Sequence, residues 1–237
     1  MLFRSRTAGE AGHATGSLES ILADASVAVI ASPNHLHRAQ LEQALAAGCD
    51  VMVEKPIATV CAGLDSLLDR ARADGRIVGV GCNLRFVAAI EMLKAIVDDG
   101  RLGSLIRVRA DFGWDLRRWR PGRDLRSSYS ANAAEGGGIL LDAIHEFDYL
   151  YWIFGPVRRV SCFAGSRTSL ALEVEDVACT LLDFGSGLLG EVALDYASGV
   201  YRRGYEIVGE GGSATWRWPR PRRARSEEHT SELQSRF

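Results

Sequence analysis

The sequence contains very little lysine. Of its 28 basic residues only Lys55 and Lys94 are lysines, and the other 26 are arginines. Such a bias is typical of a GC-rich coding sequence, so each retained lysine is a candidate functional residue. The chain also lacks any apolar run near the ~18 residues that a membrane-spanning helix needs, and we expect no secretory signal and no membrane partner. The net charge of −2 argues against a general nucleic-acid-binding protein.

Paired cysteines are also absent. The five cysteines are scattered along the chain and none has CxxC spacing. This pattern fits reduced thiols of the cytoplasm better than a disulfide framework or a zinc site, so we expect a cytoplasmic protein without a structural metal. Hydrophobic residues make up 47% and charged residues 24%, as in ordinary globular proteins. A length of 237 residues allows one large domain or two modest ones.

The first part of the chain alternates between short apolar runs and helical patterns. Strands are predicted at 27–31, 51–53 and 77–81, and helices at 36–47, 60–74 and 86–99. Strands that alternate with helices of this length indicate a parallel sheet with crossover helices, which is an α/β fold.

The pattern changes near residue 85, where we place a domain boundary. A strand at 105–112 precedes an irregular segment rich in arginine and aromatic residues at 113–135. An apolar helix is predicted from Gly136 to about Phe154, and Gly185 to Gly187 is predicted to form a hairpin turn. Further strands are predicted at 157–165, 174–184, 187–197, 203–209 and 213–218. The second domain, 85–224, is therefore predicted to be an α+β domain with a largely antiparallel open sheet.

Residues 225–237 fit neither domain. The segment RSEEHTSELQS at 225–235 matches the in-frame translation of a common sequencing-adapter oligonucleotide. We therefore expect the native reading frame to end near Ala224, and we leave the tail out of the fold prediction.

The first candidate site is Glu54-Lys55-Pro56, at the end of the second predicted strand. Open α/β sheets bind ligands at the carboxyl ends of their strands. A lysine there can donate a hydrogen bond to a substrate hydroxyl and stabilise a developing alkoxide, and Glu54 can accept bonds from ribose hydroxyls. A solvent-facing ion pair before a turn is an equally good interpretation of the tripeptide taken alone.

The second candidate site lies on the apolar helix after the three glycines. Asp142, His145 and Asp148 follow one another at steps of three, which keeps them on one drifting stripe. Buried ionisable groups cost several kcal/mol unless they are paired. The three residues therefore either form a satisfied structural network, or face water, or are catalytic. In the catalytic case the histidine moves a proton and Asp142 orients it or holds a substrate hydroxyl.

Two more polar segments follow strand ends. In Ser32-Pro33-Asn34-His35-Leu36-His37, either Asn34 caps the next helix or the segment lines a cofactor cleft with His37 facing it. Asn83-Leu84-Arg85-Phe86 follows the third strand, and a surface ion pair is the alternative role for Arg85.

The order SPNHLH, VEKP, NLRF and GGGILLDAIHEFD resembles the Gfo/Idh/MocA family of NAD(P)-dependent oxidoreductases over about residues 17–218. The resemblance implies a Rossmann domain (a doubly wound parallel sheet), a substrate domain, and a homo-oligomer formed through the open sheet. It implies catalytic roles for Lys55, Asp142 and His145. The positions implied to line the cofactor are Ser32, Pro33, Asn34, His37, Glu54, Lys55 and Asn83.

The spacing of Asp142 and His145 departs from many family members, in which the acid and the histidine are four residues apart. The form DxxHExDY is similar to a branch associated with sugars and acylated sugars, as is the segment from Arg126 to Ser130. The resemblance therefore implies a small sugar-like substrate. The residues implied to contact it are Arg85, Arg126, Tyr129, Asp142 and His145.

One element of the family pattern is missing. A Rossmann domain carries G-x-G-x-x-G after its first strand, and this sequence contains no such fingerprint. We therefore expect residues 1–84 to be an incomplete Rossmann domain, in which residues 2–6 end its second strand. Arg4 would then lie near the ribose position, where arginine suits a 2′-phosphate and slightly favours NADP over NAD.

These observations predict an oxidoreductase that transfers hydride between NAD or NADP and a sugar hydroxyl or ketone. The 237 residues alone are expected to be inactive, because they lack the loop that cradles the pyrophosphate. The alternatives are an NAD-dependent glycosidase that uses transient oxidation and a non-catalytic sugar sensor on the same fold.

Overall fold

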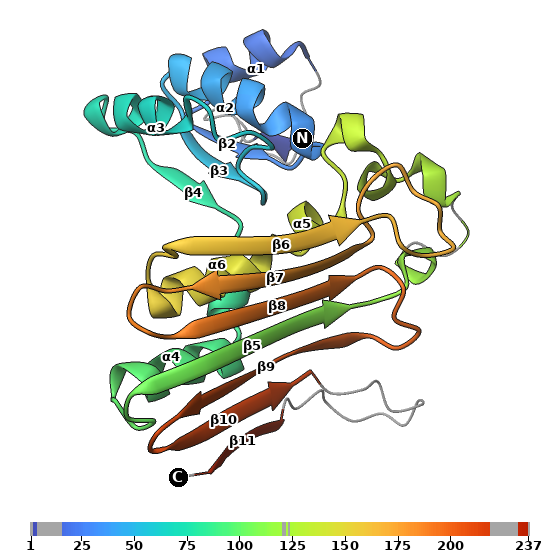
Figure 1. The fold of residues 1–237 in the computed structure, drawn as a ribbon. Coiled ribbons are helices and arrows are strands. Elements are labelled where there is room, and N and C mark those ends of the chain that lie inside the picture. The colour runs from blue at the N-terminus through green and yellow to red at the C-terminus, as the bar shows by residue number, and fades with distance from the viewer. Residues whose placement is uncertain (1, 4–15, 120–121, 123, 219–231, 237) are drawn as a thin grey trace, which may run out of the picture. The chain divides into compact units, whose positions relative to one another are not determined.

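The computed structural model describes residues 2–3, 16–119, 122, 124–218 and 232–236. The chain divides into two compact units (Figure 1). Unit 1 comprises Met1–Cys82 with Ala134–Gly136, and unit 2 comprises Asn83–Ala133 with Gly137–Phe237. Within the described residues, no helix is both long enough and apolar enough to cross a membrane.

Unit 1 contains a sheet with the strand order β1-β2-β3-β4. Its strands are β1 (Leu2–Phe3), β2 (Val27–Ile30), β3 (Asp50–Val53) and β4 (Val78–Val80). Strands β2, β3 and β4 run parallel, which confirms the predicted parallel sheet. Strand β1 pairs antiparallel with β2, so residues 2–3 are not a parallel strand of the sheet, contrary to expectation.

The helices of unit 1 follow the predicted alternation. They are α1 (Leu18–Ala23), the short 3-10 helix η1 (Asn34–Leu36), α2 (His37–Ala46) and α3 (Leu64–Ala73). Helix α3 begins later than predicted because Gly63 adopts a left-handed conformation with φ 73° immediately before it. The core forms where alternate residues of β2 and β3 pack with α2, among them Ile30, Val53 and Leu41.

Unit 2 contains a larger sheet with the strand order β11-β10-β9-β5-β8-β7-β6. All neighbours are antiparallel except the parallel pair β5 and β8, which confirms the predicted largely antiparallel sheet. The strands are β5 (Leu105–Gly113), β6 (Arg159–Gly165), β7 (Val177–Asp183), β8 (Leu189–Asp195), β9 (Arg202–Gly209), β10 (Gly212–Arg217) and β11 (Glu232–Arg236). All but the last residue of strand β11 lies within the segment 225–235 that matches the adapter sequence.

Helices cover one face of the unit 2 sheet (Figure 1). They are the 3-10 helix η2 (Asn83–Phe86), α4 (Ala88–Asp98), α5 (Ile139–Asp142) and α6 (Ile144–Phe154). The continuous helix predicted after the glycines is wrong at one point, because the backbone of Ala143 (φ −98°, ψ 29°) separates α5 from α6. The irregular segment contains the 3-10 turns η3 (Leu116–Arg118), η4 (Leu125–Ser127), η5 (Tyr129–Ala131) and η6 (Ala133–Glu135).

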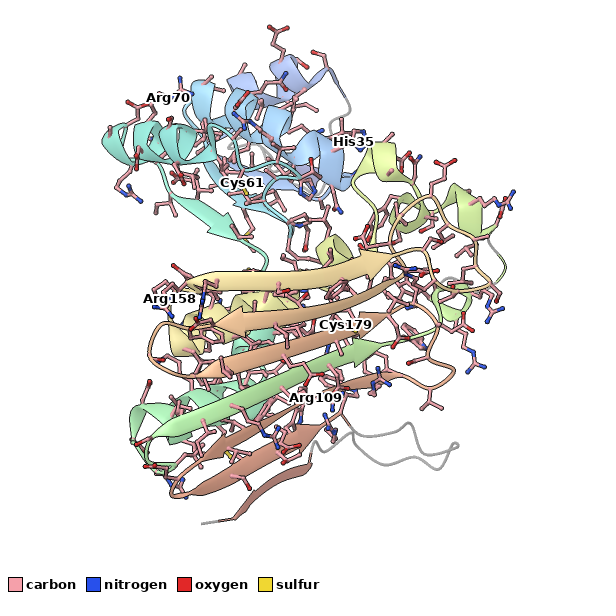
Figure 2. The ribbon with its side chains drawn as sticks, viewed as in Figure 1. His35, Cys61, Arg70, Arg109, Arg158 and Cys179 are labelled. Carbon is pink, nitrogen blue, oxygen red and sulfur yellow. The ribbon has the colours of Figure 1, made fainter. Side chains whose placement is uncertain are left out.

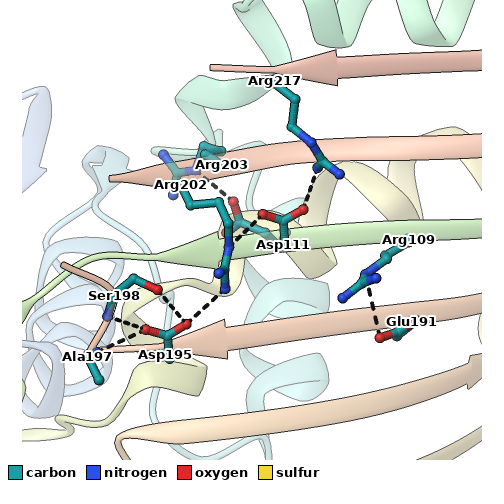
Figure 3. A network of polar contacts seen from close by, with 10 residues as sticks. Arg109, Asp111, Glu191, Asp195, Ala197, Ser198, Arg202, Arg203 and Arg217 are labelled. Carbon is teal, nitrogen blue, oxygen red and sulfur yellow. Dashed lines mark hydrogen bonds and ion pairs between the residues drawn. The ribbon is translucent and has the colours of Figure 1, made fainter. Parts of the chain in front are cut away.

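The two faces of the unit 2 sheet differ in character. On β5, Val108, Ala110 and Phe112 belong to the buried core, whereas Arg109 on the opposite face is exposed (Figure 2). That open face carries a network in which Asp111 accepts contacts from Arg202 at 3.0 Å and Arg217 at 2.5 Å (Figure 3). Alternation of apolar and polar residues thus produces a sheet with one packed face and one charged face.

Candidate active site

The carboxyl ends of the parallel strands form the candidate cofactor edge of unit 1. The Glu54 amide donates to the Ile30 carbonyl at 2.9 Å, and the Gly81 amide donates to the Val53 carbonyl at 2.8 Å. These bonds place Glu54 and Gly81, which follow β3 and β4, at the same edge of the sheet as the end of β2. In open parallel sheets this is the edge that binds ligands.

The Glu54 side chain lies close to Gly81, which follows the end of the neighbouring strand β4. A Cβ atom added to Gly81 would lie 3.1 Å from Oε2 of Glu54, so the glycine leaves room for the carboxylate. Glu54 is exposed, Lys55 is half-buried, and Pro56 is buried after a cis Lys55–Pro56 peptide bond. The carboxylate is therefore available to accept bonds from a hydroxylated ligand at this edge.

Asn34 does not cap a helix. Neither η1 nor α2 receives a side-chain cap, and Asn34 Nδ2 instead donates to the Gly136 carbonyl at 2.8 Å. Gly136 has φ 75°, and a Cβ atom there would lie 2.5 Å from Cγ2 of Thr59. Gly136 is therefore required at this position, because a side chain there would clash with Thr59.

His37 is fully buried and contacts two turns. Its Nδ1 lies 2.7 Å from the Pro56 carbonyl oxygen and its Nε2 lies 2.8 Å from the Ser32 carbonyl oxygen. The hydroxyl of Ser32 in turn donates to Oε1 of Gln40 on α2 at 2.8 Å. The ring of His37 therefore contacts protein carbonyls on both sides at the edge where the cofactor was expected.

In unit 2, Asp142 at the end of α5 accepts a hydrogen bond from Tyr196, a residue that the sequence patterns did not indicate. The Tyr196 hydroxyl donates to Oδ2 of Asp142 at 2.6 Å, and both residues are buried. Burial and the neighbouring Asp142 charge raise the pKa of Tyr196 far above its ordinary value. Tyr196 therefore stays protonated and acts as a permanent donor to the carboxylate.

His145 lies in the first turn of α6 and is 9% exposed. The break at Ala143 places it on a different helix from Asp142, so the predicted stripe is not continuous. Asp148 faces Arg85 instead: Nε and Nη2 of the arginine lie 2.9 Å and 2.6 Å from its carboxylate oxygens. The ion pair that was the alternative for Arg85 is therefore present, and its role in substrate binding stays a prediction.

Glu175 binds the first two residues after the glycines through its backbone carbonyl and its carboxylate. The Leu140 amide donates to Oε1 of Glu175 at 3.2 Å, and the Ile139 amide donates to the Glu175 backbone carbonyl at 3.0 Å. A Cβ atom on Gly138 would lie 2.6 Å from Oε2 of Glu175. Gly138 therefore lets Glu175 reach the start of α5.

The sequence matches the model of the GFO/IDH/MocA C-terminal domain over residues 90–215 and that of an oxidoreductase family with an NAD-binding Rossmann fold over residues 5–82. The chain belongs to the Gfo/Idh/MocA family.

Individual relatives agree with this assignment. The chain is 29% identical over 194 residues to trans-1,2-dihydrobenzene-1,2-diol dehydrogenase of Mus musculus, covering 81% of this chain and 56% of that protein. It is 26% identical over 210 residues to 1,5-anhydro-D-fructose reductase of Ensifer adhaerens, covering 85% of this chain and 60% of that protein. The chain therefore spans between half and two thirds of the length of these curated relatives.

A solved structure shows the same fold. The WlbA dehydrogenase from Bordetella pertussis, in complex with NADH and UDP-GlcNAcA, superposes with a TM-score of 0.75 at 25% identity, covering 86% of this chain and 59% of that one. Family membership confirms the predicted resemblance to NAD-binding oxidoreductases. The preference for NADP stays a prediction, because Arg4 lies outside the described residues.

The remaining predicted residues are placed as follows. Asn83 is exposed and begins η2, and Pro33 is exposed before η1. Arg126 is exposed on η4, where its amide donates to Oδ1 of Asp124 at 3.1 Å. Tyr129 is half-buried on η5. Over the described ranges, no group of three or more His, Cys, Asp or Glu is arranged to hold a metal ion.

Helix α6 of this Gfo/Idh/MocA chain is anchored by a buried ion pair that was also missed. Arg203 on β9 donates from Nε to Oε1 of Glu146 at 2.8 Å, and Glu146 is completely buried. The guanidinium lies 4.4 Å from the ring centroid of Phe112. Glu146 follows His145 directly, so the pair fixes the turn that carries the histidine.

Proposed function

We propose that this protein is a dehydrogenase that acts on a hydroxyl or ketone carbon of a small sugar or sugar derivative. The proposal rests on the buried Tyr196–Asp142 hydrogen bond beside the turn of His145, in a chain that carries Lys55 shortly after the carboxyl end of β3. The names of the mouse and Ensifer relatives, a diol dehydrogenase and an anhydrofructose reductase, support this class of substrate.

The proposed reaction gives a separate role to each residue that the family resemblance implies. In the oxidative direction, Lys55 donates a hydrogen bond to the reacting oxygen and stabilises the negative charge that develops on it. His145 takes the hydroxyl proton, and returns a proton to the oxygen in the reductive direction. Asp142, oriented by Tyr196, holds a neighbouring substrate hydroxyl or orients the histidine.

The residues present fit one part of the expected cofactor. The carboxylate of Glu54, accommodated by Gly81, offers acceptors for ribose hydroxyls at the strand edge. The 237 residues contain no G-x-G-x-x-G segment to cradle a pyrophosphate. When bound, the nicotinamide would supply the hydride acceptor or donor. We therefore expect the chain alone to bind NADH too weakly to quench its fluorescence at micromolar concentrations.

The other lysine provides a matched control for the test. The test uses a protein in which the amino end of this chain is extended with a βαβ segment that carries the glycine fingerprint of a family member. Hydride transfer is measured by NAD(P)H absorbance over a panel of sugars. Lys55→Ala is expected to lower kcat at least a hundredfold, whereas Lys94→Ala leaves it unchanged, because Lys94 pairs with Asp98 at 2.6 Å on α4. Wild-type turnover in Lys55→Ala would exclude the proposed role.

The open face of the unit 2 sheet supports a second copy of this chain as a partner. Leu181 and Leu189 are each 60% exposed, and Phe163 is 81% exposed. The same face carries charges of both signs, such as Arg109 beside Glu191 at 3.6 Å. A face with apolar patches and charges of both signs can pair with its own copy.

A further inference from the structure

Helix α5, which ends at Asp142, is a single turn that needs support from outside. It comprises only Ile139–Asp142, whereas isolated helices shorter than about 12 residues are marginal in water. The Asp142 amide donates to the Gly138 carbonyl at 3.0 Å, so this bond links the end of the helix to the residue before its start. The position of Asp142 therefore depends on the contacts that hold the two ends of α5.

Glu175 holds the start of α5 through two acceptors. Its backbone carbonyl accepts from the Ile139 amide at 3.0 Å, and Oε1 of its side chain accepts from the Leu140 amide at 3.2 Å. The first amides of a helix have no carbonyl within the helix to bond, so they need acceptors of this kind. A Cβ atom on Gly138 would lie 2.6 Å from Oε2 of Glu175, so the glycine makes room for the carboxylate. The glutamate side chain and the glycine before α5 thus fit one another.

Glu175 is itself held in place by the residue that follows it. The Asp176 side chain is 0% exposed, and it accepts from the amide and the hydroxyl of Thr168 at 3.2 Å and 2.5 Å. The Asp176 carbonyl accepts from the Tyr196 amide at 2.9 Å. Burial and the charge of Asp142 raise the pKa of Tyr196, and the nearby charge of Glu175 adds to them. Residues 175–176 therefore contact both the start of α5 and the tyrosine that binds its end.

We propose that Glu175 is a positioning residue that, together with Tyr196, fixes the place of the Asp142 carboxylate. Glu175 binds the first turn of α5 and Tyr196 binds its last residue, so α5 is held from both ends. Loss of the Glu175 side chain leaves the start of α5 with only the backbone bond, and the shift reaches Asp142 through its bond to Gly138. The effect on hydride transfer rests on the proposed function of Asp142, whereas the placement of its carboxylate does not.

Three variants separate the Glu175 side chain from its backbone. Glu175→Ala removes the acceptor of the Leu140 amide and leaves the backbone bond to Ile139. Glu175→Gln keeps an acceptor oxygen at the same reach, so it is expected to behave like the parent. Glu173→Ala is the matched control, because Glu173 is an exposed carboxylate two residues away on the same segment.

The first measurement follows the Tyr196–Asp142 bond by NMR in protein labelled with carbon-13 at tyrosine Cζ, whose shift responds to hydrogen bonding of the hydroxyl. The chain has six tyrosines, and the Tyr196 signal is assigned by its loss in Tyr196→Phe. We expect Glu175→Ala to move this signal, and Glu175→Gln and Glu173→Ala to leave it at the parent position. An unchanged Tyr196 signal in folded Glu175→Ala would overturn the proposal. A displacement in Glu175→Gln as large as that in Glu175→Ala would contradict the role as a hydrogen-bond acceptor.

The unaltered chain provides a test that needs no variant, in case Glu175→Ala fails to fold. The Leu140 amide is bonded to Glu175, so its exchange with deuterium is expected to be much slower than in an unstructured peptide. Exchange of this amide at the rate of an unstructured peptide would show that the bond does not hold α5, and would overturn the proposal.

The last measurement uses kinetics of the extended protein. Glu175→Ala should lower kcat about tenfold or more with a smaller change in KM, because a small misplacement of a group in the site is costly, and Glu175→Gln should restore most of the loss. A purely structural role would lower stability without this difference between kcat and KM. A parent-like kcat in Glu175→Ala would exclude the effect on hydride transfer. If the extended parent transfers no hydride while the Tyr196 signal responds as expected, the proposed function fails and the placement of Asp142 by Glu175 is still supported.

Discussion

Tyr196 and Asp142 are joined by a hydrogen bond of 2.6 Å between a buried hydroxyl and a buried carboxylate. The two residues come from different elements: Tyr196 follows the end of β8 and Asp142 ends α5. The hydroxyl cannot ionise in the physiological range because its pKa is raised by burial and by Asp142. The carboxylate is thus held in one orientation next to the turn of His145.

Removal of this hydroxyl is expected to destabilise unit 2. Tyr196→Phe removes the hydroxyl that donates to a buried oxygen of Asp142, and the loss of this hydrogen bond should lower the free energy of unfolding by about 1–3 kcal/mol. Urea denaturation measures the loss. The control is Tyr151→Phe, because Tyr151 is 57% exposed. If both variants lose the same stability, the bond contributes nothing measurable. In the extended protein, Tyr196→Phe should also lower kcat more than it raises KM, because it disorders Asp142.

The second of the three glycines should tolerate no side chain. A Cβ atom on Gly137 would lie 2.6 Å from the Ser130 carbonyl oxygen, and the Tyr129 carbonyl is also in its path. These are backbone atoms, so Gly137→Ala must displace the segment 129–130, and we expect a loss of about 1–3 kcal/mol. Gly199→Ala is the control, because nothing lies within 4 Å of a Cβ atom there. Equal thermal midpoints for the two variants would refute the prediction.

Removing only one partner of the Glu146–Arg203 ion pair should strongly destabilise the protein. Glu146→Ala leaves the Arg203 guanidinium, whose side chain is 12% exposed, without its carboxylate, and we expect a loss of about 3–5 kcal/mol. The double variant Glu146→Met/Arg203→Met should recover most of this loss, since it leaves no unpaired charge. Asp69→Ala serves as a surface control: its pair with Arg72 is 71–78% exposed and worth about 0–1 kcal/mol. Additive effects in the double variant would show that the two charges are not coupled.

Periodicity predicted the elements well but could not predict the contacts between them. The strands at β2, β3 and β4 and the hairpin of β7 and β8 come from local patterns of apolar residues. The bonds Tyr196–Asp142 and Arg203–Glu146 join residues 54 and 57 positions apart, and no local pattern encodes such pairs.

The break in the helix after the glycines illustrates the same limit. An apolar run that carries Asp142 and His145 three residues apart has the same pattern in one helix as in two. The Ala143 backbone conformation that separates α5 from α6 depends on contacts with other elements, such as Glu175 at the start of α5. The sequence shows only that three glycines follow one another at 136–138. The side chains that crowd Gly136 and Gly138 belong to Thr59 and Glu175, which are distant along the chain.

Stability should fall in acid partly because of Asp183. Arg158 and Arg159 donate to its carboxylate at 2.9 Å each and hold its pKa below the ordinary value. A carboxyl whose pKa is lower in the folded state stabilises the fold above its unfolded pKa near 4, and this contribution disappears as the pH falls through the folded pKa. The free energy of unfolding of Asp183→Asn should therefore vary less with pH below about 4 than that of the parent. Identical acid profiles would exclude a contribution from this pair. Asp65→Asn, which removes an exposed carboxyl with no ion pair among the described residues, is the control.

The open sheet face can be tested as the surface that binds a second copy. Leu181→Glu places a carboxylate on this face in both copies, and burying two unpaired charges should weaken self-association at least tenfold, a change of about 1.4 kcal/mol. The control, Val60→Glu, changes a residue of unit 1 that is similarly exposed, at 61% against 60% for Leu181. Sedimentation velocity over a range of concentrations measures the dissociation constant of each variant. We expect the parent and Val60→Glu to associate equally, because Val60 lies outside the sheet of unit 2. If Leu181→Glu associates as strongly as the parent, the proposed surface is wrong, since a second copy seated on β7 cannot accommodate the added charge without loss.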